Sequence, residues 1–254
     1  QEHLKALKQC DANIYGIIRK NQSEKYPPYK VYNWFDFKDF YKNIDGIICS
    51  VPPEEAYKIL SEKIPDHIPT LYEKPLFKDL NQLVDFKNNA SKAKKSNTFI
   101  AYNRRFYNTI NKLRELILKN ESYYLEGNFS DGYNNIINDN LADNYTVPIY
   151  ITSHWVDMVG YLIGYENLSK MEIKTSSPYH ISFHSEINGK YIELSFTPNQ
   201  ARNHYLRLKT TKGSEYLLSP LEKLDEISLN INSSNQKNFS ATKSYTVDSH
   251  PIVE

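Results

Sequence analysis

A lysine and a carboxylate stand side by side in the tripeptide Glu73-Lys74-Pro75. The tripeptide follows a short strand-like run, Thr70 to Tyr72, and its proline forces the chain to turn. Open α/β sheets hold their ligands at the carboxyl ends of their strands, so Lys74 lies where chemistry is expected. A lysine whose pKa is lowered by burial and neighbouring charge can accept a proton and then stabilise an oxyanion. The competing interpretation is a solvent-exposed lysine beside a glutamate in a turn.

A second pair of polar side chains, His154 and Asp157, lies on a helix predicted from residue 149 to residue 163. Residues three apart share nearly the same helix face. A histidine can donate to or accept from a substrate hydroxyl, and an aspartate can fix the histidine tautomer or hold the neighbouring lobe. Because the pattern His-x-x-Asp is common, a pair that only stabilises the fold remains the alternative, above all for Asp157.

The composition argues against several classes of partner. The 254 residues include 31 lysines and arginines against 30 aspartates and glutamates, and this balance argues against nucleic acid and anionic membranes as partners. No apolar run approaches the roughly 18 residues of a membrane span. Cys10 and Cys49 are too few and too far apart for a disulfide framework or a zinc site. We therefore expect a cytoplasmic protein with reduced thiols, no bound metal and a small-molecule partner.

Strands and helices alternate over the first part of the chain. Buried strands are predicted at Ala12–Ile18, Asp45–Val51, Thr70–Tyr72 and Asn97–Tyr102, with helices at Glu54–Ile64 and Lys78–Lys95. The run from Lys92 to Lys95 is interpreted as a solvated last helical turn. The alternation predicts a parallel, doubly wound α/β sheet as a first domain over residues 1–105.

The pattern changes after residue 105. An amphipathic helix is predicted at Thr109–Leu118, and Met171 to Val247 forms alternating segments with turns at Asn188-Gly189 and Lys212-Gly213. We predict a second, α+β domain over residues 106–254 with a large, mostly antiparallel sheet. One face of such a sheet can stay open, and its Tyr, Phe and Leu content suits a contact between copies in a homo-oligomer.

Four features follow one another along the chain in a defined order. They are Glu73-Lys74-Pro75 after a strand, Tyr102-Asn103-Arg104-Arg105-Phe106, His154-Trp155-Val156-Asp157 leading to Leu162-Ile163-Gly164, and the large sheet. This order resembles the Gfo/Idh/MocA family of NAD(P)-dependent oxidoreductases. The resemblance implies a Rossmann-like first domain and hydride transfer between NAD or NADP and a hydroxyl or carbonyl of a sugar, sugar nucleotide or cyclic polyol. In that reaction Lys74 would move the proton and His154 would face the substrate.

The resemblance also assigns residues to the cofactor. Ser50, Pro52 and Pro53 end a strand where related proteins pass the cofactor's ribose and nicotinamide. Because such contacts are made mostly by backbone, an ordinary helix N-terminus is the alternative for each side chain. Glu73 would orient Lys74 or the nicotinamide ribose.

Two pairs of residues bear on specificity. Arg19 and Lys20 stand where NAD-specific relatives place an acid, so they favour the 2′-phosphate of NADP, with a solvated strand end as the alternative. Asn103 and Arg105 correspond to the family's substrate-side loop, where an arginine suits a phosphate or carboxylate. One of the two adjacent arginines is expected to form only a structural pair.

The chain departs from the family pattern in two ways that matter for function. It contains no GxGxxG; the family's first strand and phosphate loop would lie upstream of Gln1, and we expect a chain trimmed at this end. Tyr150 stands four residues before His154, where relatives often carry an aspartate. If Lys74 lowers the pKa of this phenol, the two groups could share the proton transfer. The alternative is a non-catalytic relative that binds a sugar nucleotide or serves as a scaffold subunit.

Overall fold

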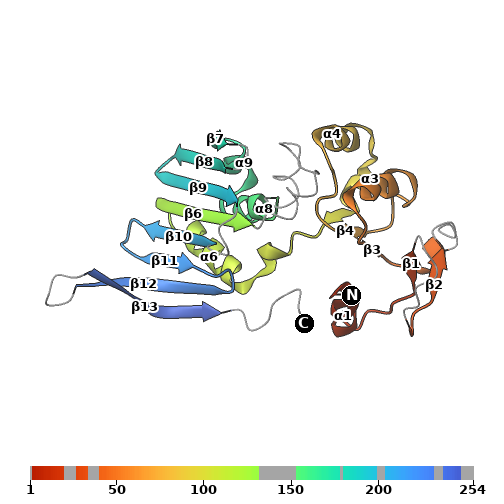
Figure 1. Cartoon of the computed structure of the whole chain (residues 1–254), viewed down its shortest axis with the longest axis horizontal. Coiled ribbons are helices and arrows are strands. Elements are labelled where there is room, and N and C mark those ends of the chain that lie inside the picture. Colours follow the sequence, from red (N-terminus) through yellow and green to blue (C-terminus); the bar gives the residue numbers. More distant parts are fainter. Residues whose placement is uncertain are drawn as a thin grey trace. The chain divides into compact units, whose positions relative to one another are not determined.

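The computed structural model describes residues 2–19, 27–33, 40–131, 153–177, 180–198, 204–231 and 237–246. The chain forms two compact units, a first built mainly from Gln1–Ala101 and a second from Tyr102–Pro251. Figure 1 labels the helices and strands of both units. Each unit has its own hydrophobic core, so each is stabilised by its own buried side chains.

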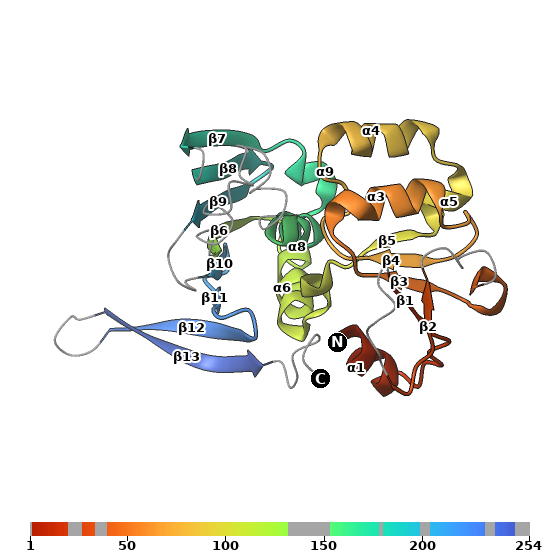
Figure 2. The ribbon, with the colours of Figure 1, turned by 45° about the vertical axis from the view of Figure 1, so that its right-hand side comes forward.

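The first unit contains two groups of parallel strands. β1 (Ile17–Arg19) pairs with β2 (Val31–Asn33), while β3 (Ile47–Cys49), β4 (Thr70–Tyr72) and β5 (Thr98–Ile100) form a three-stranded sheet in that order. The helical elements are α1 (Glu2–Gln9), η1 (Tyr41–Asn43), α3 (Pro53–Glu62), α4 (Leu80–Asn89) and α5 (Lys92–Ser96). In both views α3 and α4 lie on one side of β3 and β4, and α1 lies on the other (Figure 1, Figure 2). The predicted parallel, doubly wound arrangement is confirmed.

The described strands of the first unit form two separate hydrogen-bonded groups. Among the described residues, β1 bonds only to β2, and β3 bonds only to β4. Ile18 of β1 nevertheless packs against the same core as Ile47 of β3. Alternate residues of a parallel strand turn their N–H and C=O groups to opposite neighbours. Since Ile17 bonds to Lys30 of the β2 side and Cys49 to Glu73 of the β4 side, Ile18 turns these groups away from β2 and Ile48 turns them away from β4.

β4 is the most deeply buried strand of the first unit. Tyr72 is fully buried, and Leu60 of α3 and Leu76 pack in the same core. α3 begins at Pro53, whose fixed φ suits the first helical turn, and the two glutamates that follow stabilise the positive end of the helix dipole. The residues after β4 therefore leave a strand that is held firmly by the core.

The helix predicted from Lys78 to Lys95 is interrupted at Ala90 and Ser91, and its last turn is not fully solvated. Ala90 adopts an extended backbone and ends α4, and Ser91 caps the separate short helix α5. Lys94 is 8% exposed rather than solvated, and its ammonium donates to the Ile64 carbonyl and pairs with Asp66 at 3.1 Å. The charge pattern could not show this burial, because the partner carbonyl lies 30 residues earlier in the chain.

The second unit is a large mixed sheet with helices on one face. Its strands are β6 (Tyr123–Asp131), β7 (Glu172–Ser177), β8 (His180–Ile187), β9 (Lys190–Pro198), β10 (Tyr205–Thr210), β11 (Glu215–Leu218), β12 (Lys223–Ile231) and β13 (Lys237–Thr246). The eight strands have the order β13-β12-β11-β10-β6-β9-β8-β7, in which β6 and β9 are parallel and the other pairs antiparallel. The remaining elements are η2 (Asn103–Phe106), α6 (Asn108–Leu118), α8 (Ser153–Ile163) and α9 (Tyr165–Leu168). The predicted sheet is confirmed, as is its hairpin turn at Asn188-Gly189, where both residues have positive φ.

Side chains alternate between the two faces of this sheet. Leu206 and Leu208 are fully buried in the core that α6 and α8 help to form, whereas Tyr205 and Arg207 turn to the opposite, open face. Figure 2 shows α6 and α8 on one side of the strands. Most of the described Phe and Leu side chains that the sequence suggested for a subunit contact therefore serve the core. The open face carries tyrosines and charged residues together with Leu217 and Ile227.

Two further findings concern membranes and metals. Within the described ranges, no helix is long and apolar enough to cross a membrane. The same residues contain no group of three or more His, Cys, Asp or Glu side chains that could hold a metal ion. Cys49 is buried, Cys10 is exposed, and both are free.

The burial of Lys94 gives a first prediction. Replacing Lys94 by Met should lower the free energy of unfolding by about 2 kcal/mol, because a charged donor to the Ile64 carbonyl and to Asp66 is lost. Urea unfolding measures the effect. The exposed neighbour Lys95, replaced by Met, is the matched control and should leave the urea midpoint unchanged. Equal midpoints for the two variants would contradict the structural role of Lys94.

Candidate functional site

The carboxyl ends of β3 and β4 bring two predicted segments together in the first unit. The strands are parallel neighbours with Cys49 opposite Tyr72, so Ser50 and Glu73 leave the sheet at the same edge. The Glu73 N–H donates to the Cys49 carbonyl at 3.0 Å and fixes this arrangement. The half-buried Lys74 follows directly. The structure therefore gathers the strand-end residues at the edge where ligands of such sheets bind.

Glu73 has a partner that the sequence did not suggest. Its Oε1 lies 2.7 Å from Nε2 of His3 on α1, and the two side chains are 37% and 34% exposed. The contact joins the N-terminal helix to the turn after β4, across 70 positions of sequence. Glu73 is thus held by its backbone to β3 and by its carboxylate to α1.

The other predicted cofactor residues lie at strand ends of the same unit. Pro52 is exposed and its carbonyl accepts the N–H groups of Glu55 and Ala56, while Pro53 begins α3. Arg19 is the half-buried last residue of β1. Lys20 lies outside the described residues.

These residues fit part of a nicotinamide dinucleotide. Donors and a carboxylate at the ends of parallel strands suit ribose hydroxyls and a nicotinamide amide, and Arg19 suits a ribose 2′-phosphate. Pyrophosphate in such folds rests on a glycine-rich turn before a helix, and the sequence contains no GxGxxG. No residue of this chain is therefore assigned to the pyrophosphate.

In the second unit, a buried carboxylate holds the loop that the sequence assigned to the substrate. Asp157 of α8 is 7% exposed. The guanidinium of Arg105 in η2 donates two hydrogen bonds to its carboxylate, one of them from Nε to Oδ2 at 3.1 Å. The Tyr165 hydroxyl donates to Asp157 Oδ1 at 2.8 Å and accepts from Arg105 Nη2 at 3.0 Å. We call these three residues the Asp157 cluster. Both predicted residues in it are thus engaged with one another.

The electrostatics of the Asp157 cluster follow from burial and pairing. Burial lowers the pKa of Arg105, but the hydrogen bond and charge of Asp157 outweigh it and raise that pKa. Burial, and then the hydrogen bond to Asp157, raise the pKa of Tyr165. A paired guanidinium with raised pKa is a fixed cation, so Arg105 is suited to holding η2 on α8 rather than to exchanging protons.

Arg104, which the sequence did not single out from its neighbour, packs on an aromatic ring of α8. Its guanidinium carbon lies 3.6 Å from the ring centre of Trp155, which is 1% exposed and stacks on Phe129 at 4.5 Å. The next residue back, Asn103, has a buried Nδ2 with no hydrogen-bond acceptor. Adjacent residues of a 3₁₀ helix point about 120° apart, so only one of two consecutive arginines could reach Asp157. The adjacency of the two arginines in the sequence was therefore the only available sign that one of them stays apart from Asp157. It could not show which one.

His154 lies one residue before Trp155, at the start of α8. Its ring meets Tyr102 edge-on at 5.8 Å, and it is half-buried. Burial raises the pKa of Tyr102, with the Asp157 carboxylate adding to the effect. Both carboxylate oxygens of Asp157 accept hydrogen bonds from Arg105 and Tyr165. The predicted role of Asp157 in fixing the His154 tautomer is therefore unsupported. Tyr150 lies outside the described residues.

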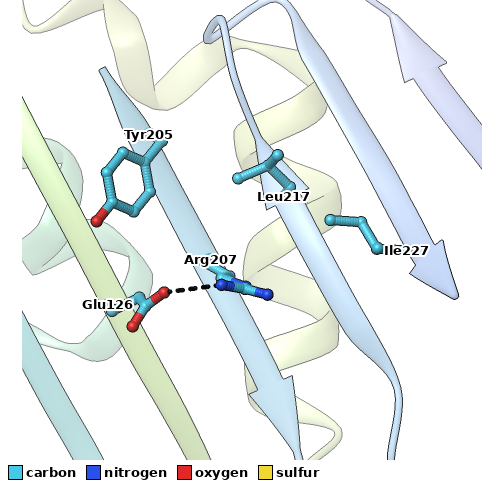
Figure 3. Close-up of a pocket in the computed structure, with 5 residues that line it drawn as sticks. All are labelled: Glu126, Tyr205, Arg207, Leu217 and Ile227. Atoms are coloured by element: carbon cyan, nitrogen blue, oxygen red, sulfur yellow. Dashed lines mark hydrogen bonds and ion pairs between the residues drawn. The ribbon is translucent and has the colours of Figure 1, made fainter. Parts of the chain in front are cut away.

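A separate shallow cavity of about 300 Å³ lies on the open face of the large sheet (Figure 3). It is lined by Glu126, Tyr205, Arg207, Leu217 and Ile227, none of which was a predicted site residue. Arg207 pairs there with Glu126 at 3.4 Å and with Glu215. Aliphatic side chains beside paired charges are typical of a macromolecular contact rather than of an acid–base site.

No protein-family profile matches the chain, and no curated protein matches it in sequence. Solved structures match it in fold. The WlbA (WbpB) dehydrogenase from Thermus thermophilus, in complex with NAD and UDP-GlcNAcA, has a TM-score of 0.61 and 14% identity over 86% of this chain and 79% of that chain. Myo-inositol 2-dehydrogenase from Lactobacillus plantarum has a TM-score of 0.59 and 13% identity over 94% and 78%. The transcriptional regulator Gal80p from Kluyveromyces lactis has a TM-score of 0.67 and 15% identity over 99% and 73%.

These similarities establish the fold. A parallel α/β lobe followed by a large mixed sheet is shared with sugar and polyol dehydrogenases and also with a transcriptional regulator. At such identities, function has to be argued from the residues of this chain.

The Asp157 cluster gives a second prediction. Replacing Asp157 by Asn should lower the free energy of unfolding by about 3 kcal/mol, because the Arg105 guanidinium loses its buried counter-charge. Chemical unfolding measures the loss. The control is Glu115→Gln, which removes one partner of the solvent-exposed Lys112–Glu115 pair and should leave the midpoint unchanged. A midpoint for Asp157→Asn equal to that of the control would show that the ion pair contributes little.

Proposed function

We propose that the chain is an oxidoreductase that transfers a hydride between a nicotinamide cofactor and a hydroxyl or carbonyl of a sugar, sugar nucleotide or cyclic polyol. One observation carries the proposal: Lys74 stands at the carboxyl end of the buried strand β4, in a fold shared with sugar and polyol dehydrogenases. A lysine at that place is suited to moving the hydroxyl proton.

The cofactor is proposed to be NAD or NADP. The strand-end residues Ser50, Pro52, Pro53 and Glu73 would contact its ribose and nicotinamide, and the WlbA structures contain NAD. Arg19, with Lys20 next to it, would favour the 2′-phosphate of NADP. When bound, the nicotinamide supplies or accepts the hydride; the pyrophosphate is left without an assigned partner.

The proposed chemistry divides between several side chains. Lys74 would accept the proton of a secondary hydroxyl during oxidation and return it during reduction. His154 would hydrogen-bond a substrate hydroxyl, and Asn103 would offer its buried amide N–H groups to substrate oxygens. Arg104 is proposed to face an anionic part of the substrate, and Arg105 to hold η2 on α8 through its ion pair with Asp157.

Tyr150 is proposed as a second proton-transferring group in addition to Lys74. A nearby ammonium lowers the pKa of a phenol, and the phenol can then relay a proton. Replacing Tyr150 by Phe removes only the hydroxyl. Turnover that matches the parent in Tyr150→Phe would rule this role out.

A second copy of the chain is proposed as the partner of the open sheet face. Tyr205, Leu217 and Ile227 supply apolar area there, and paired charges such as Arg207 with Glu126 reduce the cost of covering polar groups. Burial and then the Glu126 charge raise the pKa of Tyr205, so its hydroxyl stays neutral and able to donate. The face is therefore suited to a contact with a mixed polar and apolar character.

The enzymatic proposal predicts two separable effects of one substitution. Lys74→Ala should reduce turnover on a responsive sugar or polyol by about 10²- to 10⁴-fold, the usual worth of a general acid–base group. Binding of NADH or NADPH, followed by the fluorescence of the reduced nicotinamide, should persist. Lys78→Ala, at an exposed lysine four residues on, is the control and should retain turnover.

The same titration separates the enzyme from a non-catalytic binding or scaffold subunit. Absence of any NADH or NADPH binding by the parent chain, together with binding of a sugar nucleotide, would favour the subunit. Equal turnover in Lys74→Ala and the parent would contradict the proposed role of Lys74 in proton transfer but not the oxidoreductase activity itself.

The open face gives a prediction of its own. Leu217→Lys places a charge at the centre of the proposed contact and should weaken self-association ~tenfold or more. Sedimentation velocity over a concentration series measures the change. Leu118→Lys, on α6 and already 66% exposed, is the matched control and should associate like the parent. A parent chain that stays monomeric at all concentrations would contradict the proposed partner.

A further inference from the structure

We infer that Tyr165 is a positioning residue: through Arg105 and Asp157 it sets the place of Arg104 over Trp155. The inference extends the proposed function, since it concerns the group proposed to meet an anionic substrate. It rests on hydrogen bonds and packing within the second unit.

Tyr165 completes the set of contacts around a carboxylate that is shielded from water. Asp157 has two oxygens to satisfy, and Arg105 alone supplies donors to both. The Tyr165 hydroxyl adds a third donor, to Oδ1 at 2.8 Å, and accepts from Arg105 Nη2 at 3.0 Å. A hydroxyl that bonds to both partners of an ion pair restricts their rotation about each other.

The fold makes a specific place for this tyrosine. Gly164 has φ +91° and turns the chain from α8 into the short α9, so that Tyr165 folds back along α8. A Cβ at Gly160 would lie 2.5 Å from the Tyr165 ring. Glycine at position 160 therefore lets the ring lie against α8, and glycine at position 164 permits the turn that brings it there.

The restraint passes to Arg104 through one short element. η2 is only four residues long, and among the described contacts Arg105 fixes it to α8. Arg104 is covalently next to Arg105, and its guanidinium lies 3.6 Å from the ring centre of Trp155 on the same helix α8. By anchoring Arg105 to α8, the ion pair restrains the backbone of η2, and this limits the directions open to the Arg104 side chain. Without the Tyr165 hydroxyl, Arg105 could rotate on Asp157 and the stack of Arg104 on Trp155 would loosen.

Trp155 supplies a direct readout, because a cation above an indole ring changes its magnetic environment. The chain has two tryptophans, Trp34 and Trp155, so incorporation of 5-fluorotryptophan should give two fluorine resonances. Trp34→Phe assigns them. Arg104→Gln defines how far the Trp155 resonance moves when the cation is absent.

The test compares two hydroxyl deletions on neighbouring tyrosines in the full chain. Tyr165→Phe should move the Trp155 resonance toward its position in Arg104→Gln. Tyr161→Phe, which removes a 2.7 Å hydrogen bond from α8 to Asn111, should lower thermal stability and leave the resonance in place. In an Arg104→Gln background, Tyr165→Phe should cause no further movement, which separates an effect through Arg104 from a shift of α8 itself.

Gly160→Ala provides a second perturbation in case Tyr165→Phe folds poorly, since it displaces the ring while keeping the hydroxyl. It should move the resonance in the same direction. The inference is overturned if both variants fold and leave Trp155 where the parent has it, or if Tyr161→Phe moves the resonance as much as Tyr165→Phe. Tyr165→Phe could move the Trp155 resonance and yet bind glucuronate and glucose with the same relative affinity as the parent. That result would leave the positioning role intact and refute the proposed substrate contact of Arg104.

Discussion

The second unit depends on the rule that a carboxylate taken out of water must be paired. Asp157 is 7% exposed, and Arg105 and Tyr165 donate the hydrogen bonds that stabilise its charge. Because these partners come from η2 and α9, one carboxylate on α8 draws two other elements to it. The place of Asp157 in the sequence, three residues after His154, thus says less about catalysis than about how the segment before α6 is held.

The first unit depends on a different constraint, the register of two parallel strands. Cys49 lies opposite Tyr72, so the segments after β3 and β4 leave the sheet at one edge whatever their side chains are. Glu73 is then held twice, by its N–H to the Cys49 carbonyl and by its carboxylate to His3. Lys74 therefore follows a residue whose backbone and side chain are both fixed, as a group that has to meet a substrate in one geometry requires.

The fold alone does not decide between chemistry and regulation. Dehydrogenases and the regulator Gal80p share it with this chain at 13% to 15% identity. The proposed oxidoreductase activity therefore depends on Lys74, on the strand-end residues around it and on the polar groups of η2 and α8. The proposed contact on the open face depends on Tyr205, Leu217 and the paired Arg207, which have no part in the proposed chemistry.

The sequence by itself determined the element types, the parallel character of the first unit and the large, mostly antiparallel sheet, because hydrophobic period, proline and glycine act locally. It also placed Lys74 at the end of a strand. Only the tertiary structure decided that Lys94 is buried, that His3 binds Glu73, that Arg105 rather than Arg104 pairs with Asp157, and that most Phe and Leu of the sheet face the core. These facts join residues that are 30 to 70 positions apart, and no local pattern carries information about a partner at that distance.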